Sequence, residues 1–253
     1  MSSAQGSGSS NPQRSRHQGR GAARTAVVWD ALRVLLAKTH GTASVIDVGG
    51  GTGGFAVRVA ELGHAVTVID PSPDALAISA RRAEESGVAD RITAIQGDLA
   101  GMSGLVDPGS ADVVLCHGVL EIVEDPEAAL VTIAEVLRPE GALSLLVNQR
   151  HAAVVARAMA GHFTQARALL DEPMAGGATR RFTAVEVAEL LGRTGFETTE
   201  VHAVRVFVDL VPSSLVDLEP GAATALVELE KAVADRPEYL ALGTQLHALA
   251  TRR

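Results

Sequence analysis

Apolar positions along this chain alternate between the spacing of a buried strand and that of an amphipathic helix. Short runs rich in Val, Ile and Leu are followed repeatedly by segments with an apolar residue every three or four positions. Strands alternating with helices predict a mostly parallel sheet with helices on both faces. The predicted strands span residues 44–48, 65–69, 91–96, 112–116 and 142–147, and the predicted helices span residues 26–37, 53–62, 73–87 and 126–137.

Local signals mark where several helices begin. Ser72 and Asp125 each precede a proline, which is typical of an N-cap residue followed by the first helical position. Thr183 with Glu186 has the spacing of a capping box, so a further helix is expected from there to about Gly192.

The pattern changes after Asn148, and its elements are less regular. The segment 242–251 fits a helix as well as it fits a strand. Elsewhere we expect one or two helices in residues 151–170, a flexible loop in 171–182, a strand-like segment in 196–211 and a helix in 221–235.

Composition supports one α/β domain over residues 21–253, with a core in 43–148 and substrate-side elements in 149–253. The hydrophobic share of 47% is enough to fill a substantial core. Residues 1–20 are polar and rich in Ser, Gly and Arg, so we expect a disordered tail. That tail is either a solvated leader or an arm that orders over the site or contacts a polyanion.

Cysteine usage and hydropathy narrow the setting of the protein. Cys116 is the single cysteine, so no intrachain disulfide can form, and a reduced cytoplasmic setting is expected. The N-terminus has no apolar segment of secretory type, and no apolar run approaches membrane-spanning length. The histidines are scattered and Cys116 has no partner, so no metal site is expected.

The net charge of −8 argues against a protein that binds nucleic acid over its whole surface, because a negative surface repels phosphates. Arg14, Arg16, Arg20 and Arg24, however, lie in a stretch without acidic residues, so a local basic surface is expected there.

The strongest functional signal is the run Asp47-Val-Gly-Gly-Gly-Thr-Gly53 between a predicted strand and a predicted helix. Glycines let the backbone turn sharply and let a ligand lie against it, and the helix start offers free N–H donors. The spacing Gly49-x-Gly51-x-x-Gly54 also satisfies the dinucleotide fingerprint, with Asp70 about 20 residues on. The glycines therefore indicate a nucleotide without choosing which one.

Three acids favour S-adenosylmethionine. Asp47 precedes the first glycine by two residues, where a carboxylate attracts an ammonium group and repels two phosphates. Asp70 ends the second strand, where it can accept from both ribose hydroxyls. Asp98 ends the third strand, where it can accept from the adenine amino group while Leu99 packs on the ring. A sulfonium cation suits such an acidic pocket.

These motifs, together with the segment from Ala111 to Val147, resemble class I methyltransferases. The resemblance implies a Rossmann-like α/β fold with a seven-stranded sheet of order 3-2-1-4-5-7-6, in which residues 242–251 form a last, antiparallel strand. It also implies S-adenosylmethionine as cofactor and S-adenosylhomocysteine as product. The cofactor-binding residues expected on this basis are Arg24, Asp47, Gly49, Gly51, Gly53, Asp70, Pro71, Asp98, Leu99 and His117.

The chain also resembles the bacterial tRNA 5-carboxymethoxyuridine methyltransferases over roughly residues 20–253. Those enzymes carry a run of lysines where this chain has only Arg180 and Arg181, and they have a Tyr-Gly pair before Gly21 where this chain has Arg16-His17. The resemblance is carried by Gly21, Arg24, Trp29, residues 116–121, Asn148, residues 160–163, residues 204–209, Leu226, Glu228, Leu240 and Gly243.

Methylation of a carboxylate needs no general base, because the acceptor is already ionised at neutral pH. It does need a clamp, and arginine matches a carboxylate bidentately. Four arginines are candidates, each with a structural alternative: Arg24, Arg150, Arg181 and Arg205, with Arg24 more cofactor-facing; Asn148 joins the substrate side by resemblance.

The segment after the fourth strand adds one candidate for catalysis. His117 lies where open α/β sheets bind ligands. We expect it either to orient substrate or to act as a base for a hydroxyl or amine acceptor. The structural alternative is a packed histidine that is hydrogen-bonded to the backbone. Cys116 is expected to face the core on the opposite side. Glu121 and Glu124 are expected to cap or solvate the following turn rather than perform chemistry.

The first functional hypothesis is a tRNA wobble-uridine carboxyl methyltransferase, with His117 and Arg205 as the catalytic candidates. The second is a methyltransferase that acts on the oxygen or nitrogen of a small metabolite. The third is a regulator that binds S-adenosylmethionine without turnover, and a dehydrogenase is a distant fourth.

Overall fold

The computed structural model describes residues 12–39, 41–172, 179–216 and 220–253. These residues form a seven-stranded sheet with the strand order β3-β2-β1-β4-β5-β7-β6, in which β7 runs antiparallel to both of its neighbours. The predicted strand order and the antiparallel last strand are therefore confirmed. The strands are β1 (Ser44–Val48), β2 (Ala65–Asp70), β3 (Ile92–Gln96), β4 (Ala111–His117), β5 (Leu137–Asn148), β6 (Phe196–Val204) and β7 (Gln245–Arg252).

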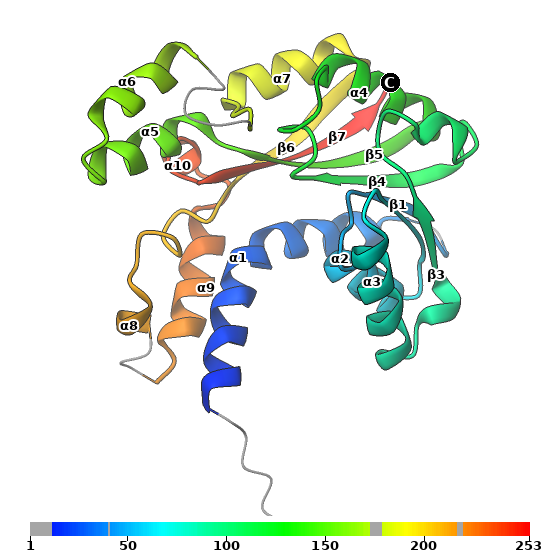
Figure 1. The fold of residues 1–253 in the computed structure, drawn as a ribbon, viewed down its shortest axis with the longest axis horizontal. Helices are drawn as coiled ribbons and strands as arrows, with labels where there is room; N and C mark the ends of the chain where they lie inside the picture. The colour runs from blue at the N-terminus through cyan, green and yellow to red at the C-terminus, as the bar shows by residue number, and fades with distance from the viewer. Residues whose placement is uncertain (1–11, 40, 173–178, 217–219) are drawn as a thin grey trace, which may run out of the picture.

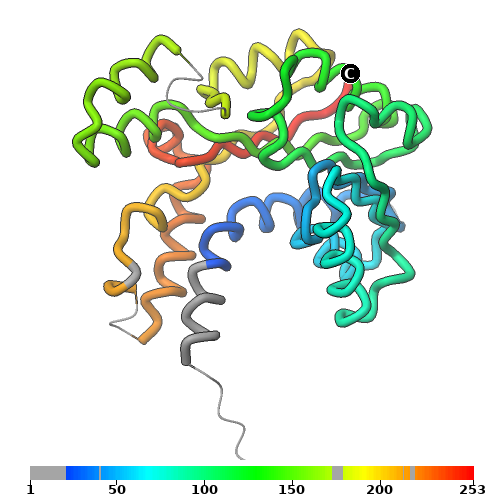
Figure 2. Tube along the Cα trace, in the orientation of Figure 1, coloured from blue at the N-terminus to red at the C-terminus, as the bar shows by residue number. Residues whose placement is uncertain are grey.

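Helices cover both faces of the sheet (Figure 1). On one face lie α1 (Pro12–Ala37), α2 (Gly54–Glu61), α3 (Pro73–Glu85) and α9 (Ala222–Val233), and on the other lie α4 (Pro126–Val136) and α7 (Ala184–Arg193). Helices α5 (Arg150–Met159) and α6 (Phe163–Asp171) pair beyond the end of β5, and α8 (Ser213–Val216) and α10 (Pro237–Leu240) are single turns. Figure 2 shows α1 beside α9 before it passes beneath the sheet.

Side chains alternate between two cores along each strand. On β4, Val113 and Leu115 pack in the core toward α1 and α2, whereas Val114 and Cys116 pack in the core toward α4 and α7. Cys116 is fully buried there, as predicted. His117 follows the alternation and belongs to the opposite face of the sheet, which is the face that α1 and α2 cover.

The predicted helix starts are confirmed by their hydrogen bonds. The Ser72 hydroxyl accepts from the Ala75 N–H at 3.2 Å, and the Asp125 carboxylate accepts from two backbone N–H groups. Both bonds of the Thr183–Glu186 capping box are present. These bonds satisfy N–H groups that have no partner inside the helix.

Two elements begin several residues earlier than predicted. Helix α1 begins at Pro12, so residues 12–20 are helical although the sequence analysis placed them in the tail; residues 1–11 lie outside the described residues. Strand β5 begins at Leu137, five residues earlier than expected, with Glu140 at a φ of 63°. Of the expected loop, residues 173–178 lie outside the described residues.

The strand predicted over residues 196–211 ends at Val204, and this prediction was wrong for residues 205–211. Arg205 has a φ of 62°, a left-handed conformation that turns the chain out of the sheet. The next three backbone N–H groups, those of residues 206–208, donate to the carboxylate of Glu230 on α9 at 2.7–2.8 Å. Glu230 is fully buried, so this carboxylate takes the place of a neighbouring strand.

We predict that Glu230→Gln lowers the free energy of unfolding by about 1–3 kcal/mol. The amide nitrogen cannot accept a hydrogen bond, so a buried N–H group of the 206–208 segment loses its partner. Urea denaturation followed by circular dichroism measures this change. Glu228→Gln is the matched control, because Glu228 lies exposed on the same helix. Equal stability of both variants would show that the carboxylate does not hold the segment.

Candidate functional site

The glycine-rich loop joins β1 to α2 at the carboxyl edge of the sheet. The Gly49 N–H donates to the Ile69 carbonyl at 2.7 Å, and Gly49 and Gly53 have φ values of 67° and 76°. A Cβ at Gly49 would lie 2.4 Å from a methyl of Val119, and a Cβ at Gly53 would lie 2.3 Å from the Ser79 hydroxyl. Both positions therefore require glycine for conformation and for space.

The loop is open at Gly51, which also has a positive φ of 54°. A Cβ added there would meet nothing closer than 3.8 Å, so this part of the loop leaves room beside its backbone. The Gly51 N–H donates to Asp70 Oδ2 at 2.9 Å. The loop thus offers a backbone cradle whose outer side is free for a ligand.

Asp70 holds the loop against the end of β2. Its second oxygen, Oδ1, accepts from the Ser72 N–H at 2.9 Å, and the residue is 8% exposed. Each carboxylate oxygen has two lone pairs, so one remains on each for the two hydroxyls of a ribose. The adjacent Pro71 is exposed, and its carbonyl accepts from Gln96 at the end of β3 at 3.3 Å.

Asp47 presents a buried carboxyl group with a free oxygen. It is 3% exposed, and its Oδ2 has no hydrogen-bond partner among the described residues. Burial, and then the charge of Asp70, raises the pKa of Asp47 to about 7. An unpartnered buried carboxyl beside the open loop fits a ligand that brings a positive charge, as the amino acid part of S-adenosylmethionine does.

Asp98 and Leu99, which follow β3, differ in their exposure to solvent. Asp98 is exposed, and its Oδ1 accepts from the Gly101 N–H at 2.9 Å. Leu99 is 2% exposed and belongs to the core that also contains Ile69 and Met102. Contact of these two residues with an adenine ring stays a prediction.

His117 lies at the end of β4 with its ring edge-on to Phe55 of α2, at a centroid distance of 4.8 Å. Its Nε2 lies 2.9 Å from the Ser144 hydroxyl, and its Nδ1 has no partner among the described residues. Burial lowers the pKa of His117 to about 4, so the ring is neutral at physiological pH.

Arg24 and Arg205 meet at one carboxylate. Arg24 Nη2 lies 3.2 Å from Asp209 Oδ1, and Arg205 Nη2 lies 2.6 Å from Asp209 Oδ2. The Thr244 hydroxyl also donates to Asp209, and Arg205 Nη1 donates to Gln245 at 3.4 Å. Both arginines were predicted from the sequence, whereas Asp209, which lies in the segment 204–209 together with Arg205, was not.

The other substrate-side candidates make mainly structural contacts. Arg150 Nη2 pairs with Glu186 Oε1 at 2.6 Å, which joins α5 to the start of α7. The carbonyl of Asn148 accepts from the Phe182 N–H, and Arg181 Nη1 lies 3.5 Å from the Thr179 carbonyl. Burial, and then Arg157, lowers the pKa of Arg181.

Glu121, which was expected to cap or solvate the following turn, is buried and therefore not solvated. Glu121 is 2% exposed, and its Oε1 accepts from the Asn148 N–H at 2.8 Å, while Oε2 has no partner in the described part of the chain. Burial raises the pKa of Glu121. Its backbone carbonyl accepts from the Arg180 N–H, so Glu121 ties the ends of β4 and β5 to the segment before α7.

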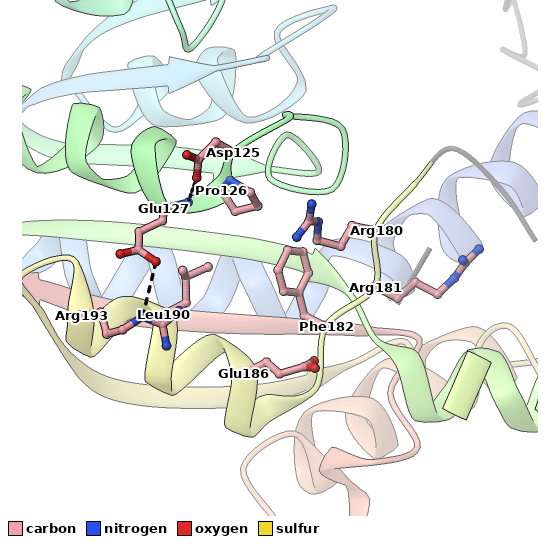
Figure 3. A pocket seen from close by; sticks show the side chains of 9 residues that line it. All are labelled: Asp125, Pro126, Glu127, Arg180, Arg181, Phe182, Glu186, Leu190 and Arg193. Carbon is pink, nitrogen blue, oxygen red and sulfur yellow. Dashed lines mark hydrogen bonds and ion pairs between the residues drawn. The ribbon is translucent and has the colours of Figure 1, made fainter. Parts of the chain in front are cut away.

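A pocket of about 280 Å³ lies between the start of α4 and α7 (Figure 3). Arg180 points toward Asp125 and Pro126, whereas Arg181 points to the far side of Phe182. Arg193 pairs with Glu127 at 3.4 Å across the pocket. Of the arginines that line this pocket, Arg181 alone was a substrate candidate.

Two further residues near the site were missed. The hydroxyl of Ser144 is hydrogen-bonded to both His117 and His247, and Ser144 and His247 are fully buried. Each interrupts a short apolar strand sequence, which is the signal that would have found them. Within the described residues, no cluster of His, Cys, Asp or Glu has the arrangement of a metal site, and no helix is long and apolar enough to cross a membrane.

We predict that S-adenosylmethionine binding releases about half a proton at pH 7. In the free protein the Asp47 carboxyl has a pKa of about 7, and a bound cation favours its ionised form. Affinity should therefore rise as the pH rises from about 5 to 7 and level off above. Calorimetry in buffers of different ionisation enthalpy measures the release.

Two variants calibrate this measurement. Asp47→Asn should bind without proton release, whereas Asp74→Asn, which changes an exposed acid on α3, should keep it. Without ligand, the raised pKa lowers the stability of the parent as the pH rises from about 4 to 7, and Asp47→Asn should lose this dependence. A binding heat independent of the buffer in the parent protein would contradict the assignment.

Comparisons with known proteins agree with this geometry. The model of the methyltransferase domain family matches residues 46–145, which run from within β1 to within β5 and include the glycine loop. The tRNA 5-carboxymethoxyuridine methyltransferase of Escherichia coli O157:H7 is 32% identical over 247 residues, covering 92% of this chain and 89% of that one. The ubiquinone biosynthesis O-methyltransferase of Xanthomonas euvesicatoria is 38% identical over 121 residues, which cover 47% of this chain and 48% of that one.

A solved S-adenosylmethionine-dependent methyltransferase from Mesorhizobium loti has the same fold. It superimposes with a TM-score of 0.61 at 22% identity and covers 92% of this chain and 100% of that one. The sheet order, the loop and its acids, and the match along nearly the whole chain lead to one conclusion: this chain belongs to the class I S-adenosylmethionine-dependent methyltransferases.

Proposed function

We propose that this methyltransferase acts on the carboxylate of a 5-carboxymethoxyuridine in tRNA. The observation that carries the proposal is the extent of the similarity to the E. coli tRNA enzyme, which covers 92% of this chain. The match therefore includes substrate-side elements, where methyltransferases with other acceptors differ most.

A carboxylate acceptor makes modest demands on the protein. It is ionised at neutral pH, so no group has to remove a proton before it attacks the methyl group. The cofactor supplies an electrophilic methyl on a sulfonium cation. What remains for the protein is to hold the acceptor oxygen in line with that methyl group, so positioning supplies most of the acceleration.

Arg205 is the residue we propose for positioning the acceptor. Its side chain is 27% exposed, while its Nε, which has no partner among the described residues, is itself buried. Asp209 accepts from both Arg205 and Arg24, so it fixes two guanidinium groups at the same edge of the sheet as the cofactor loop. A substrate carboxylate would meet an arginine that is already oriented.

The pair α5–α6 supports a polyanionic substrate. The pair contains Arg150, Arg157 and Arg167 and one acidic residue, Asp171 at the end of α6, in a chain whose net charge is −8. Arg167 is exposed, and Phe163 at the start of α6 is 71% exposed. Exposed aromatic rings beside arginines suit stacking on bases and contact with phosphates. This pair follows directly on the carboxyl end of β5.

One observation favours a different acceptor. The loop before α7 keeps only Arg180 and Arg181 where the tRNA enzymes carry a run of lysines, which reduces the charge available for phosphates. A methyltransferase of a small metabolite, modifying an oxygen or a nitrogen, is therefore the second candidate. A regulator that binds the cofactor without turnover is the third.

We expect labelled methyl from S-adenosylmethionine to enter tRNA that carries 5-carboxymethoxyuridine. The label should be released by mild alkali, because a carboxyl methyl ester hydrolyses where an ether or an amine does not. A small-molecule extract incubated in parallel tests the second candidate. Alkali-stable label in the extract alone would move the assignment to an O- or N-methylated metabolite, and no label in either would favour the regulator.

We predict that Arg205→Lys lowers kcat/KM for the acceptor by roughly tenfold or more and leaves cofactor affinity unchanged. Lysine keeps the charge but loses the planar fork that orients a carboxylate. Steady-state methyl transfer and calorimetry measure the two quantities. Arg193→Lys on α7 is the control, because Arg193 is exposed and pairs with Glu127. Parent-like turnover by Arg205→Lys would remove Arg205 from the acceptor site.

A further inference from the structure

The glycine loop, residues 49–53, is held from outside and not by a helix cap. Gly49, Gly51 and Gly53 all have positive φ values, and glycine loses more conformational freedom on folding than any other residue. Helix α2 begins after Gly53, which has no side chain to bond a backbone N–H, whereas α3, α4 and α7 each have a side-chain cap. A capping side chain would occupy N–H groups that a ligand can use. The loop therefore has to be fixed by contacts from another element.

Arg82 of α3 provides one of these contacts. Its Nη1 donates to the Thr52 carbonyl at 3.1 Å and to the Thr52 hydroxyl at 2.9 Å. Thr52 lies in the turn immediately before the N-cap of α2, and α3 lies beside α2 (Figure 1). One guanidinium group thus bonds both the backbone and the side chain of a single loop residue.

The two neighbours of Thr52 in the loop are held by the same part of the chain. The Gly51 N–H donates to Asp70 at the end of β2, and only residues 71 and 72 separate β2 from α3. Gly53 packs against Ser79, which is fully buried on α3 one turn before the arginine. Three successive loop residues are therefore contacted by three different residues of the continuous segment β2–α3.

Arg82 can affect cofactor binding in two ways that have opposite signs. A loop that is ordered before the ligand arrives does not have to be ordered during binding, so a tether raises the affinity. A positive charge near a loop that binds a sulfonium cation lowers the affinity instead. Removal of the arginine weakens binding if the tether dominates, and strengthens it if the charge dominates.

We propose that Arg82 is a positioning residue for the cofactor, which holds the glycine loop in its binding conformation before S-adenosylmethionine arrives. It acts through Thr52 and does not touch the reacting atoms. The two hydrogen bonds to one loop residue carry this proposal, because they fix the loop at the point where α2 has no capping side chain. The proposal does not depend on the identity of the methyl acceptor.

Calorimetry with S-adenosylmethionine and S-adenosylhomocysteine distinguishes the tether from the charge. Arg82→Ala should weaken the binding of both by the same factor, about three- to tenfold, as the loss of one net hydrogen bond would. Arg81→Ala is the matched control, because Arg81 carries the same charge on the same helix but pairs with Glu85 in solvent. It should bind both ligands like the parent. Unchanged affinity of Arg82→Ala, or tighter binding of the cationic ligand, would overturn the proposal.

A double-variant cycle tests whether Arg82 acts through Thr52. Thr52→Val keeps the shape of the side chain and removes one of the two acceptors, so it should weaken binding by part of the amount seen with Arg82→Ala. In an Arg82→Ala background it should have no further effect, since the bond is already absent. Fully additive losses would show that the two residues act separately and would overturn the proposed tether.

Amide hydrogen exchange of the loop provides a readout that overall stability does not move. Without ligand, the peptide that contains residues 49–53 should exchange faster in Arg82→Ala than in the parent or in Arg81→Ala. With bound S-adenosylhomocysteine the three proteins should exchange alike, because the ligand then orders the loop. Parent-like exchange of the free Arg82→Ala protein would show that the loop is held without Arg82.

Turnover separates this role from a role in the chemical step. Once an acceptor is methylated, Arg82→Ala should raise KM for S-adenosylmethionine and leave kcat at saturating cofactor unchanged. A lower kcat with an unchanged KM would contradict a role in cofactor binding. If no acceptor is methylated, the proposed function fails, while the calorimetry and the hydrogen exchange still decide whether Arg82 positions the loop.

Discussion

Buried carboxylates that accept backbone N–H groups hold the functional edge of this sheet in place. Asp70 holds the cofactor loop, Glu121 holds the end of β5, and Glu230 holds the turn that follows β6. Strand ends have no neighbouring strand to satisfy their amides, and a buried amide without a partner is costly. A carboxylate on another element supplies the acceptor. Each such bond to a charged group contributes about 1.5–3 kcal/mol.

Carboxylates also shape the electrostatics of the site. Asp47 and Asp70 make the edge beside the glycine loop negative, which suits a cationic cofactor, and burial followed by the charge of Asp70 raises the pKa of Asp47 to about 7. Further along the edge a carboxylate holds two arginines, since Asp209 accepts from Arg24 and Arg205. Negative and positive groups therefore lie within one row of strand ends.

How far the sequence predicts this structure depends on the separation of the interacting residues along the chain. The helix N-caps, the capping box, the turn at the glycine loop and the first five strands depend on neighbours within a few positions, and those predictions were confirmed. The predicted end of β6 was wrong because Glu230, 22 to 24 residues further along the chain, accepts the backbone N–H groups that would otherwise pair with a neighbouring strand. The contact of Ser144 with His247 joins residues 103 positions apart, and only the register of β5 with β7 brings them together.

The hydrogen bonds of His117 follow from that register. A histidine at the end of β4 is compatible with a base or with a donor when only the sequence is known. The Ser144 hydroxyl couples this histidine to His247, because its single proton makes the tautomers of the two rings depend on each other. Nδ1 of each ring is buried and has no partner among the described residues, so solvent reaches the pair from neither side. The register of three neighbouring strands therefore ties the end of β4 to a hydrogen bond deep within the core.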